Sequence, residues 1–204
     1  MITDSLKTIQ TDMNRYDAQL IAVSKKQPDN KIIEALNAGI RVYGENRVQE
    51  AQLRWEIHRQ TYPDLELHLI GPLQTNKVKD ACELFDVIHT LDREKLAQAI
   101  MKHKPEIPCF IQVNTGAEIQ KAGILVQDLK DFYNFCYSLG MNVIGLMCIP
   151  PMDDCPDGHF KILNDKAKEL KLTNLSMGMS GDYEIALKHG ATHIRVGTQL
   201  FGKR

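Results

Sequence analysis

The sequence has few aromatic residues, no long apolar run and no excess of either charge. Aromatic residues make up 6% of the 204 residues, with a single tryptophan, and the formal net charge is −1. A near-neutral chain gives no indication of a nucleic-acid or acidic-membrane partner. No apolar run reaches about eighteen residues, so no transmembrane helix is expected. The amino terminus is polar and lacks the apolar core of a signal peptide.

The cysteines are odd in number and show no CxxC spacing, which argues against a disulfide framework and against a zinc site. We expect reduced thiols, most of them in the core of a cytoplasmic protein, and no metal site. The five residues are Cys82, Cys109, Cys136, Cys148 and Cys155.

The chain also lacks a Gly/Ser-rich or Pro-rich linker, so residues 1–204 are expected to form one domain. Short apolar segments alternate with segments of helical periodicity. The expected strands are 20–25, 40–45, 65–71, 86–92, 109–114, 142–149, 174–179 and 193–198. The expected helices are 29–38, 46–60, 75–84, 93–103, 127–139, 157–171 and 182–189, preceded by an amino-terminal helix within 1–18. This alternation predicts a TIM-type (β/α)8 barrel in the α/β class, with the additional helix packed on it. An open doubly wound sheet is the alternative.

In a barrel, the carboxyl ends of all strands meet on one face, where ligands bind. Lys25 ends the first apolar segment there, although a lysine at this position alone indicates only a surface side chain. Ser180-Gly181 and Gly197-Thr198 follow the last two strands, where such barrels hold phosphate groups. The same rim lacks the paired carboxylates of a glycosidase.

A nucleophilic lysine opposite a phosphate site fits pyridoxal 5'-phosphate (PLP) held as a lysine aldimine, and it fits a sugar-phosphate aldolase as well. Arg195 helps to separate them, because an arginine facing the pyridine nitrogen of PLP keeps that nitrogen unprotonated. Side chains alternate along a strand, so only one of Lys25 and Lys26 can point into the barrel. His68, inside a strand, is expected to be a hydrogen-bonded core histidine rather than a catalytic base.

Several segments, in order along nearly the whole chain, resemble the pyridoxal phosphate homeostasis protein family, single-domain relatives of the alanine racemase amino-terminal barrel. They are AVSK (22–25), YGENRVQE (43–50), HLIGPLQTNK (68–77), VNTGAEIQKAG (113–123), GLMCIPP (145–151) and LSMGMSGDYEIALKHGATHIRVGTQLFGKR (175–204). The chain departs from the family pattern at Lys26-Gln27, at Leu67 and at Ile119-Gln120, which leaves loop properties open.

The resemblance implies a monomeric barrel that binds PLP as a Schiff base without established turnover and contributes to intracellular PLP homeostasis. It implies that Lys25 forms the Schiff base with PLP and that Arg195 faces the pyridine nitrogen of the cofactor. It implies that Ser180, Gly197 and Thr198 bind the phosphate. It also implies that Asn46 and the backbone around Ser176 and Met177 line the cofactor ring. It assigns no residue a catalytic role. It also implies that apo PLP-dependent enzymes accept the cofactor from this protein.

Two other functions stay open from the sequence. A PLP-dependent amino-acid racemase would need a second rim group near the lysine, and no tyrosine is evident after the final strands. An aldolase-like barrel without PLP would need acid/base carboxylates beside its lysine, and the rim offers only Glu45.

Overall fold

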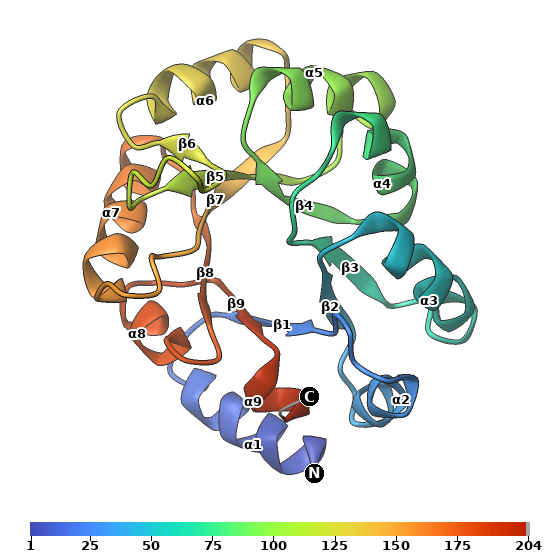
Figure 1. Ribbon diagram of the computed structural model, residues 1–204. Helices are drawn as coiled ribbons and strands as arrows, with labels where there is room; N and C mark the ends of the chain where they lie inside the picture. Colours follow the sequence, from blue (N-terminus) through green and yellow to red (C-terminus); the bar gives the residue numbers. More distant parts are fainter. Residues whose placement is uncertain (203–204) are drawn as a thin grey trace.

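The computed structural model describes residues 1–202, whose parallel strands close into a ring surrounded by helices (Figure 1). The strands are β1 (Gln19–Val23), β2 (Val42–Glu45), β3 (Glu66–Leu69), β4 (Val87–Leu91), β5 (Cys109–Asn114), β6 (Ile124–Leu125), β7 (Val143–Cys148), β8 (Asn174–Met179) and β9 (His193–Val196). Neighbours in the ring are consecutive in the chain except for β6. The ring closes because β4 pairs with β5 and β1 pairs with β9. This confirms the (β/α)8 barrel and excludes the open sheet.

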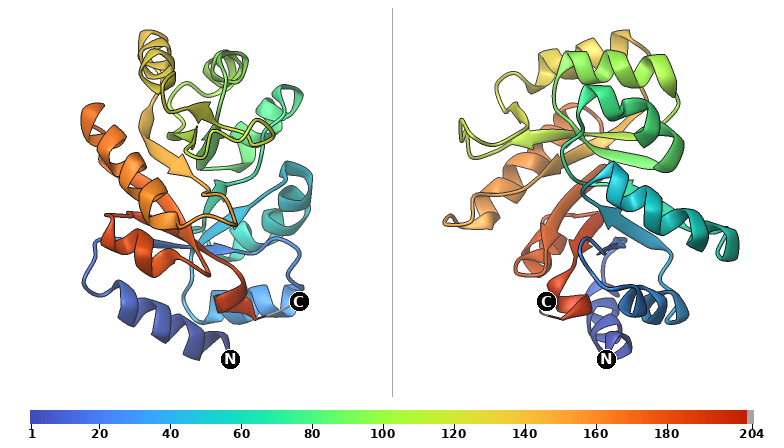
Figure 2. Two further views of the ribbon diagram at one scale, coloured as in Figure 1. Left: turned by 60° about the vertical axis from the view of Figure 1, so that its left-hand side comes forward. Right: turned by 45° about the vertical axis from the view of Figure 1, so that its right-hand side comes forward.

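The helices lie outside the ring, as the side views make plain (Figure 2). They are α1 (Ile2–Met13), α2 (Asp29–Asn37), α3 (Val48–Thr61), α4 (Val78–Leu84), α5 (Glu94–His103), α6 (Leu129–Ser138), α7 (Pro156–Glu169), α8 (Tyr183–Lys188) and α9 (Thr198–Phe201), with a 3₁₀ turn, η1 (Thr75–Lys77), before α4. Helix α1 lies between α8 and α2 and buries Ile2, Leu6 and Ile9, as the helical spacing predicts. It covers the part of the ring that the short α9 leaves open.

Strand residues alternate between two environments, as the period of two requires. In β1, Leu20 and Ala22 pack into the large apolar layer between the ring and the helices, whereas Val23 faces the interior. Besides Val23, the interior holds a small apolar cluster of Val87, Phe110 and Met147. Most of the hydrophobic core therefore lies outside the ring.

The structure differs from the expected elements at several places near the carboxyl ends of the strands, including β3, which ends at Leu69 and not at residue 71. Strand β1 ends at Val23, so Lys25 lies in a turn beyond it. The short strand β6 was not predicted; it pairs with Val113 and Asn114 at the end of β5. The last expected strand ends at Val196, and Thr198 begins helix α9 instead.

Among the described residues, none of the helices has the length and apolar character needed to cross a lipid bilayer. Cys155 is exposed, and the other cysteines are buried, as expected for core thiols. That residues 1–204 form a single domain stays a prediction.

Candidate functional site: a pocket at the carboxyl ends of the strands

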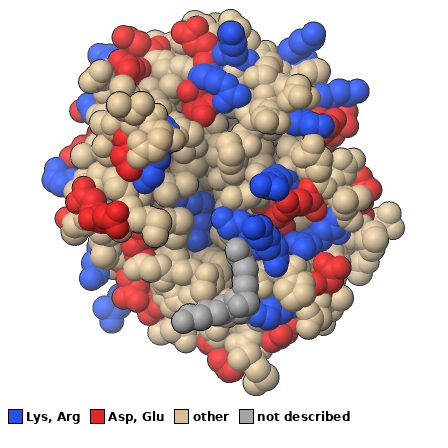
Figure 3. Space-filling model, viewed as in Figure 1, with Lys and Arg blue, Asp and Glu red and all other residues tan. Residues whose placement is uncertain are grey.

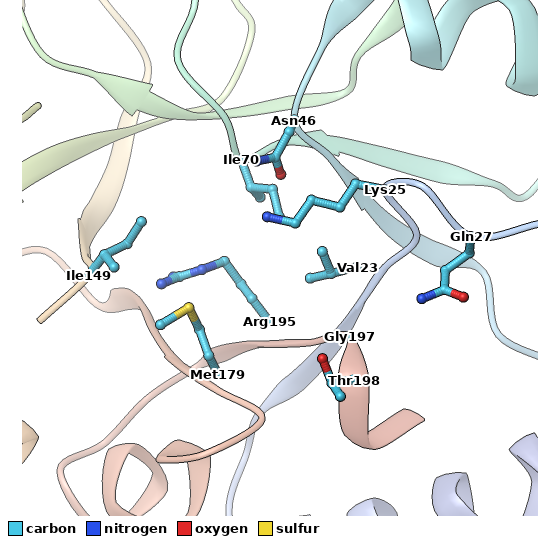
Figure 4. A pocket seen from close by; sticks show the side chains of 10 residues that line it. All are labelled: Val23, Lys25, Gln27, Asn46, Ile70, Ile149, Met179, Arg195, Gly197 and Thr198. Carbon is cyan, nitrogen blue, oxygen red and sulfur yellow. The ribbon is translucent and has the colours of Figure 1, made fainter. Parts of the chain in front are cut away.

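A cavity of about 210 Å³ opens at the carboxyl ends of the strands (Figure 4). Its size suits a small molecule. Side chains from opposite parts of the ring converge on it, with the Lys25 side chain extending across the cavity from one side and Arg195 lying opposite. The lining residues are Val23, Lys25, Gln27, Asn46, Ile70, Ile149, Met179, Arg195, Gly197 and Thr198.

Lys25 is positioned by a tight turn after β1. The Gln27 N–H donates to the Ser24 carbonyl at 3.0 Å, which closes the turn around Lys25 and Lys26. Lys26 has a φ of 58°, a left-handed conformation that is uncommon outside glycine, and its side chain is exposed. Lys25 continues the inward alternation of Val23. The structure thus directs Lys25, and not Lys26, into the cavity.

Helix α3 and the end of β2 hold this turn from outside the ring. Arg54 donates to the Ser24 carbonyl at 3.0 Å and to the Gln27 carbonyl at 2.8 Å. The Ser24 hydroxyl donates to Glu45 Oε1 at 2.7 Å, and Trp55 Nε1 donates to the same oxygen at 3.1 Å. Glu45 is only 1% exposed, so its carboxylate is committed to this cluster and does not line the cavity.

Arg195 presents its guanidinium to the cavity from the middle of the ring. The residue is 3% exposed, and it donates from one terminal nitrogen to Ser176 Oγ at 2.6 Å and from the other to the Cys148 carbonyl at 2.8 Å. Burial lowers the pKa of Arg195, but the guanidinium of arginine stays charged in proteins. These two contacts fix its plane and leave further N–H groups for a ligand.

A group of backbone donors lies where β9 gives way to α9. The N–H groups of Gly197 and Gln199 donate to Ser180 Oγ at 3.2 and 3.3 Å. The hydroxyl thereby brings the end of β8 against the first residues after β9. Thr198 adds its hydroxyl from the cavity wall. The arrangement combines hydroxyls with backbone N–H groups, the donors that bind phosphate oxygens.

Asn46 supplies an unpaired polar atom. Its Oδ1 is buried without a hydrogen-bond partner among the described residues, although the side chain lines the cavity. Such an atom is costly unless a ligand or water pairs with it. Gly71 lets the next loop approach closely here, because a Cβ at this position would lie 2.2 Å from the Asn46 carbonyl oxygen.

The cavity lining includes Lys25, Asn46, Arg195, Gly197 and Thr198 of the residues expected from the sequence. Three others do not line it. Ser180 lies behind Gly197, and Ser176 contacts Arg195 from within the ring. The Met177 side chain packs in the apolar layer outside the ring, because its place in β8 directs it toward the helices.

Five further residues line the cavity that the sequence did not assign to cofactor binding: Val23, Gln27, Ile70, Ile149 and Met179. Alternation from Lys25 is a signal that points to Val23. Ile70 could have been found as the residue that follows β3. Gln27 has no such signal, since its direction depends on the turn.

The face shown in Figure 3 has basic side chains gathered beside a central hollow, with acidic side chains next to some of them and others toward the periphery. Positive charge around a concave site raises the local concentration of anionic ligands. The pocket is therefore suited to a small anion-bearing molecule that also makes contact with apolar side chains such as Val23, Ile70 and Met179. A barrel with a rim lysine, a buried arginine and backbone donors is a small-molecule-binding (β/α)8 protein.

Comparison with known sequences identifies the family to which this barrel belongs. The model of the alanine racemase N-terminal domain matches residues 2–204. A pyridoxal phosphate homeostasis protein of Aquifex aeolicus is 42% identical over 201 residues, covering 92% of this chain and 87% of that protein. The pyridoxal phosphate homeostasis protein of Escherichia coli K12 is 36% identical over 219 residues, covering 100% of this chain and 94% of that protein. The chain belongs to the alanine racemase N-terminal domain family and, within it, to the pyridoxal phosphate homeostasis proteins.

Solved structures agree with this placement. PipY of Synechococcus elongatus PCC7942, solved with PLP bound, superposes with a TM-score of 0.90 at 37% identity, covering 99% of this chain and 100% of that one. The lysine decarboxylase of Selenomonas ruminantium superposes with a TM-score of 0.71 at 14% identity, covering 97% of this chain and 61% of that one. The second likeness concerns the fold alone.

Proposed function

We propose that this protein binds PLP covalently through Lys25 and takes part in PLP homeostasis without turning over a substrate. One observation carries the proposal: an inward lysine, a buried arginine and a group of backbone donors surround the same small cavity. The PLP-bound PipY, which covers nearly the whole chain, supports the choice of cofactor. The names of the relatives support the homeostasis role.

The residues present fit this cofactor. The unpaired Asn46 Oδ1 fits a polar substituent of the ring, and Val23, Ile70 and Met179 offer apolar contact for its faces. A phosphate would be held by the Thr198 hydroxyl, which lines the cavity, and by the Ser180 hydroxyl and the Gly197 N–H. The last two are paired with each other in this structure and would exchange that contact for the ligand. When bound, PLP would supply an aldehyde that forms an imine with a primary amine. Lys25 would supply that amine, with the aldehyde oxygen released as water.

Arg195 would face the pyridine nitrogen in this arrangement and donate a hydrogen bond to it. A guanidinium has no lone pair to accept in return, so that nitrogen stays unprotonated. An unprotonated pyridine withdraws electrons weakly and favours storage of the cofactor over stabilisation of a carbanion. Ser176 and the backbone near Met177 would act from behind Arg195 and beside the ring.

The pocket gives little support to the two alternatives. Among the described residues, the lining contains no tyrosine, histidine or carboxylate that could serve as a second acid or base for racemisation. The Tyr183 hydroxyl is directed away from the cavity and donates to Asp12 at 2.5 Å. For an aldolase, the nearby carboxylate is Glu45, which Ser24 and Trp55 already occupy outside the ring.

The test is the visible absorption spectrum of the purified protein with PLP, followed by borohydride reduction and peptide mapping. We expect a yellow protein and a reduced pyridoxyl group on Lys25. A colourless protein that takes up no PLP would contradict the proposal. An amino-acid turnover assay on the loaded protein then separates holding of PLP from racemisation, and we expect no turnover.

The wider role includes three further proposals. Apo PLP-dependent enzymes would accept the cofactor, which is measured by reactivation of an apo-enzyme with the loaded protein in the presence of a PLP scavenger. A monomer is expected by light scattering in solution. Cytoplasmic location is expected by cell fractionation.

A further inference from the structure

A line of hydrogen-bonded side chains crosses the interior of the barrel below the pocket. Glu66 Oε1 lies 2.8 Å from His68 Nε2, and His68 Nδ1 lies 2.7 Å from His89 Nε2. His89 Nδ1 lies 2.8 Å from Ser176 Oγ, which accepts from Arg195 at 2.6 Å. The line is unbroken from the first residue of β3 to the arginine of the pocket.

The two ends of this line lie at opposite faces of the barrel. Glu66 begins β3, and its side chain is 40% exposed, so it opens toward the amino-terminal face. Arg195 opens into the pocket at the carboxyl face. His68, His89 and Ser176 between them are fully buried. Phe110 stacks on His89 with ring centroids 4.3 Å apart, which holds the imidazole in its plane.

The chemistry of the ends fixes the direction of every hydrogen bond. A guanidinium only donates, and an ionised carboxylate only accepts. The hydrogen bond from His68 lowers the pKa of Glu66, which keeps that carboxylate ionised near neutral pH. Each group between the ends then donates once and accepts once. Ser176 donates to His89 Nδ1, His89 Nε2–H donates to His68 Nδ1, and His68 Nε2–H donates to Glu66.

The reverse direction satisfies fewer groups. If His68 and His89 both donated toward Ser176, the serine would accept from His89 and from Arg195. Its own buried hydroxyl proton would then have no acceptor among the described residues. Burial also lowers the pKa of His89 well below its ordinary value, in agreement with a neutral ring.

We propose that Glu66, His68 and His89 are positioning residues that act through Ser176 to fix the orientation of Arg195 in the pocket. The line places a negative charge at its far end and a positive charge at its near end. The direct partners of the buried guanidinium, Ser176 and the Cys148 carbonyl, are both neutral. Asp182 is a carboxylate whose charge favours the charged form of Arg195 through space, and Glu66 is joined to Arg195 by the hydrogen-bond line. The consequence for ligand binding rests on the proposed function.

The first arm of the test needs no ligand. Two-bond ¹H–¹⁵N correlation spectra of the wild-type protein report which imidazole nitrogen carries the proton. We expect His68 and His89 to be neutral and protonated at Nε2 at pH 7. A His89 ring protonated at Nδ1, or either ring protonated at both nitrogens, would overturn the proposal.

The second arm compares Glu66→Gln with Asp64→Asn. Asp64 is an exposed carboxylate two residues away that pairs with Arg41 and has no contact with the line. A carboxamide removes the charge and can donate as well as accept, so the direction is no longer imposed. We expect roughly threefold to tenfold weaker PLP binding and a shifted visible absorption maximum for Glu66→Gln, with moved His89 ¹⁵N signals. Asp64→Asn should match the wild type.

An unchanged affinity, absorption spectrum and His89 signal in Glu66→Gln would refute the proposal, as would an equal loss of affinity in Asp64→Asn. A wild-type protein that binds no PLP would refute the proposed function instead. In that case the tautomers of His68 and His89 in the wild-type protein and in Glu66→Gln would still decide the hydrogen-bond line.

Discussion

The two sides of the barrel sheet contain different kinds of side chain. Outside the ring, the layer against the helices is almost entirely apolar, and it includes Trp55, Phe160 and Leu69. Inside the ring, the apolar cluster is small, and polar groups such as His89 and Arg195 are buried beside it. Polar groups are costly to bury unless they are hydrogen-bonded, and both of these are bonded. The comparison indicates that the outer layer stabilises the fold and that the interior serves the pocket.

The largest effect on PLP binding is expected from the substitution Lys25→Ala. This variant should form no reducible adduct with PLP, because the amine that adds to the aldehyde is gone. Its thermal unfolding should resemble that of the wild type, since a rim lysine is not part of the core. Lys26→Ala is the matched control and should form the adduct normally. Mass spectrometry after borohydride reduction measures both, and an adduct retained in Lys25→Ala would show that another amine is used.

Phe160→Ala should destabilise the fold more than any of the pocket substitutions. Phe160 on α7 is fully buried in the outer layer, and removing such a ring costs about 3–5 kcal/mol of unfolding free energy. Denaturant unfolding measures the loss, with Tyr137→Ala on the exposed surface of α6 as the control. The folded fraction should still bind PLP. A loss of PLP affinity at full folding would mean that the outer layer also shapes the pocket.

Arg195→Gln should weaken PLP binding by about tenfold to a hundredfold, the range expected when hydrogen bonds from a charged group are lost. The absorption spectrum of the complex should also change, because a neutral amide replaces the cation beside the ring. Fluorescence or absorbance titration measures the affinity. Arg47→Gln, next to Asn46 but highly exposed, is the control and should leave both unchanged. Wild-type affinity and spectrum in Arg195→Gln would place the arginine away from the cofactor.

The last prediction concerns the reactivity of the cysteine thiols in the folded protein, which depends on how tightly the outer layer is packed. Burial raises the pKa of Cys82 to about 11 and that of Cys136 to about 12. Both should therefore stay protonated and unreactive at pH 8 in the folded protein. Titration with a thiol reagent should detect one fast group, Cys155, and the rest only after unfolding. Fast reaction of further thiols in the native protein would indicate a loosely packed layer.

The sequence determined the architecture and much of the pocket. Strand periodicity, helical periodicity and the order of elements are local properties, so they predicted the barrel correctly. Lys25, Arg195 and Gly197-Thr198 follow from that prediction, because strand ends converge once a barrel is assumed. His68 was also expected to be a hydrogen-bonded core residue, and its contacts with Glu66 and His89 confirm this.

Only the tertiary structure decided how those residues act together. His89 and Ser176 lie 87 residues apart in the chain, yet their polar atoms are 2.8 Å apart. Gln27 lines the pocket because of the turn in which it lies, and Arg54 on helix α3 stabilises that turn by donating to the Gln27 carbonyl. Met177 faces the helices because the actual register of β8 sets its side. Spacing along a strand gives the direction of a side chain, but its hydrogen-bond partners come from strands that only closure of the ring brings together.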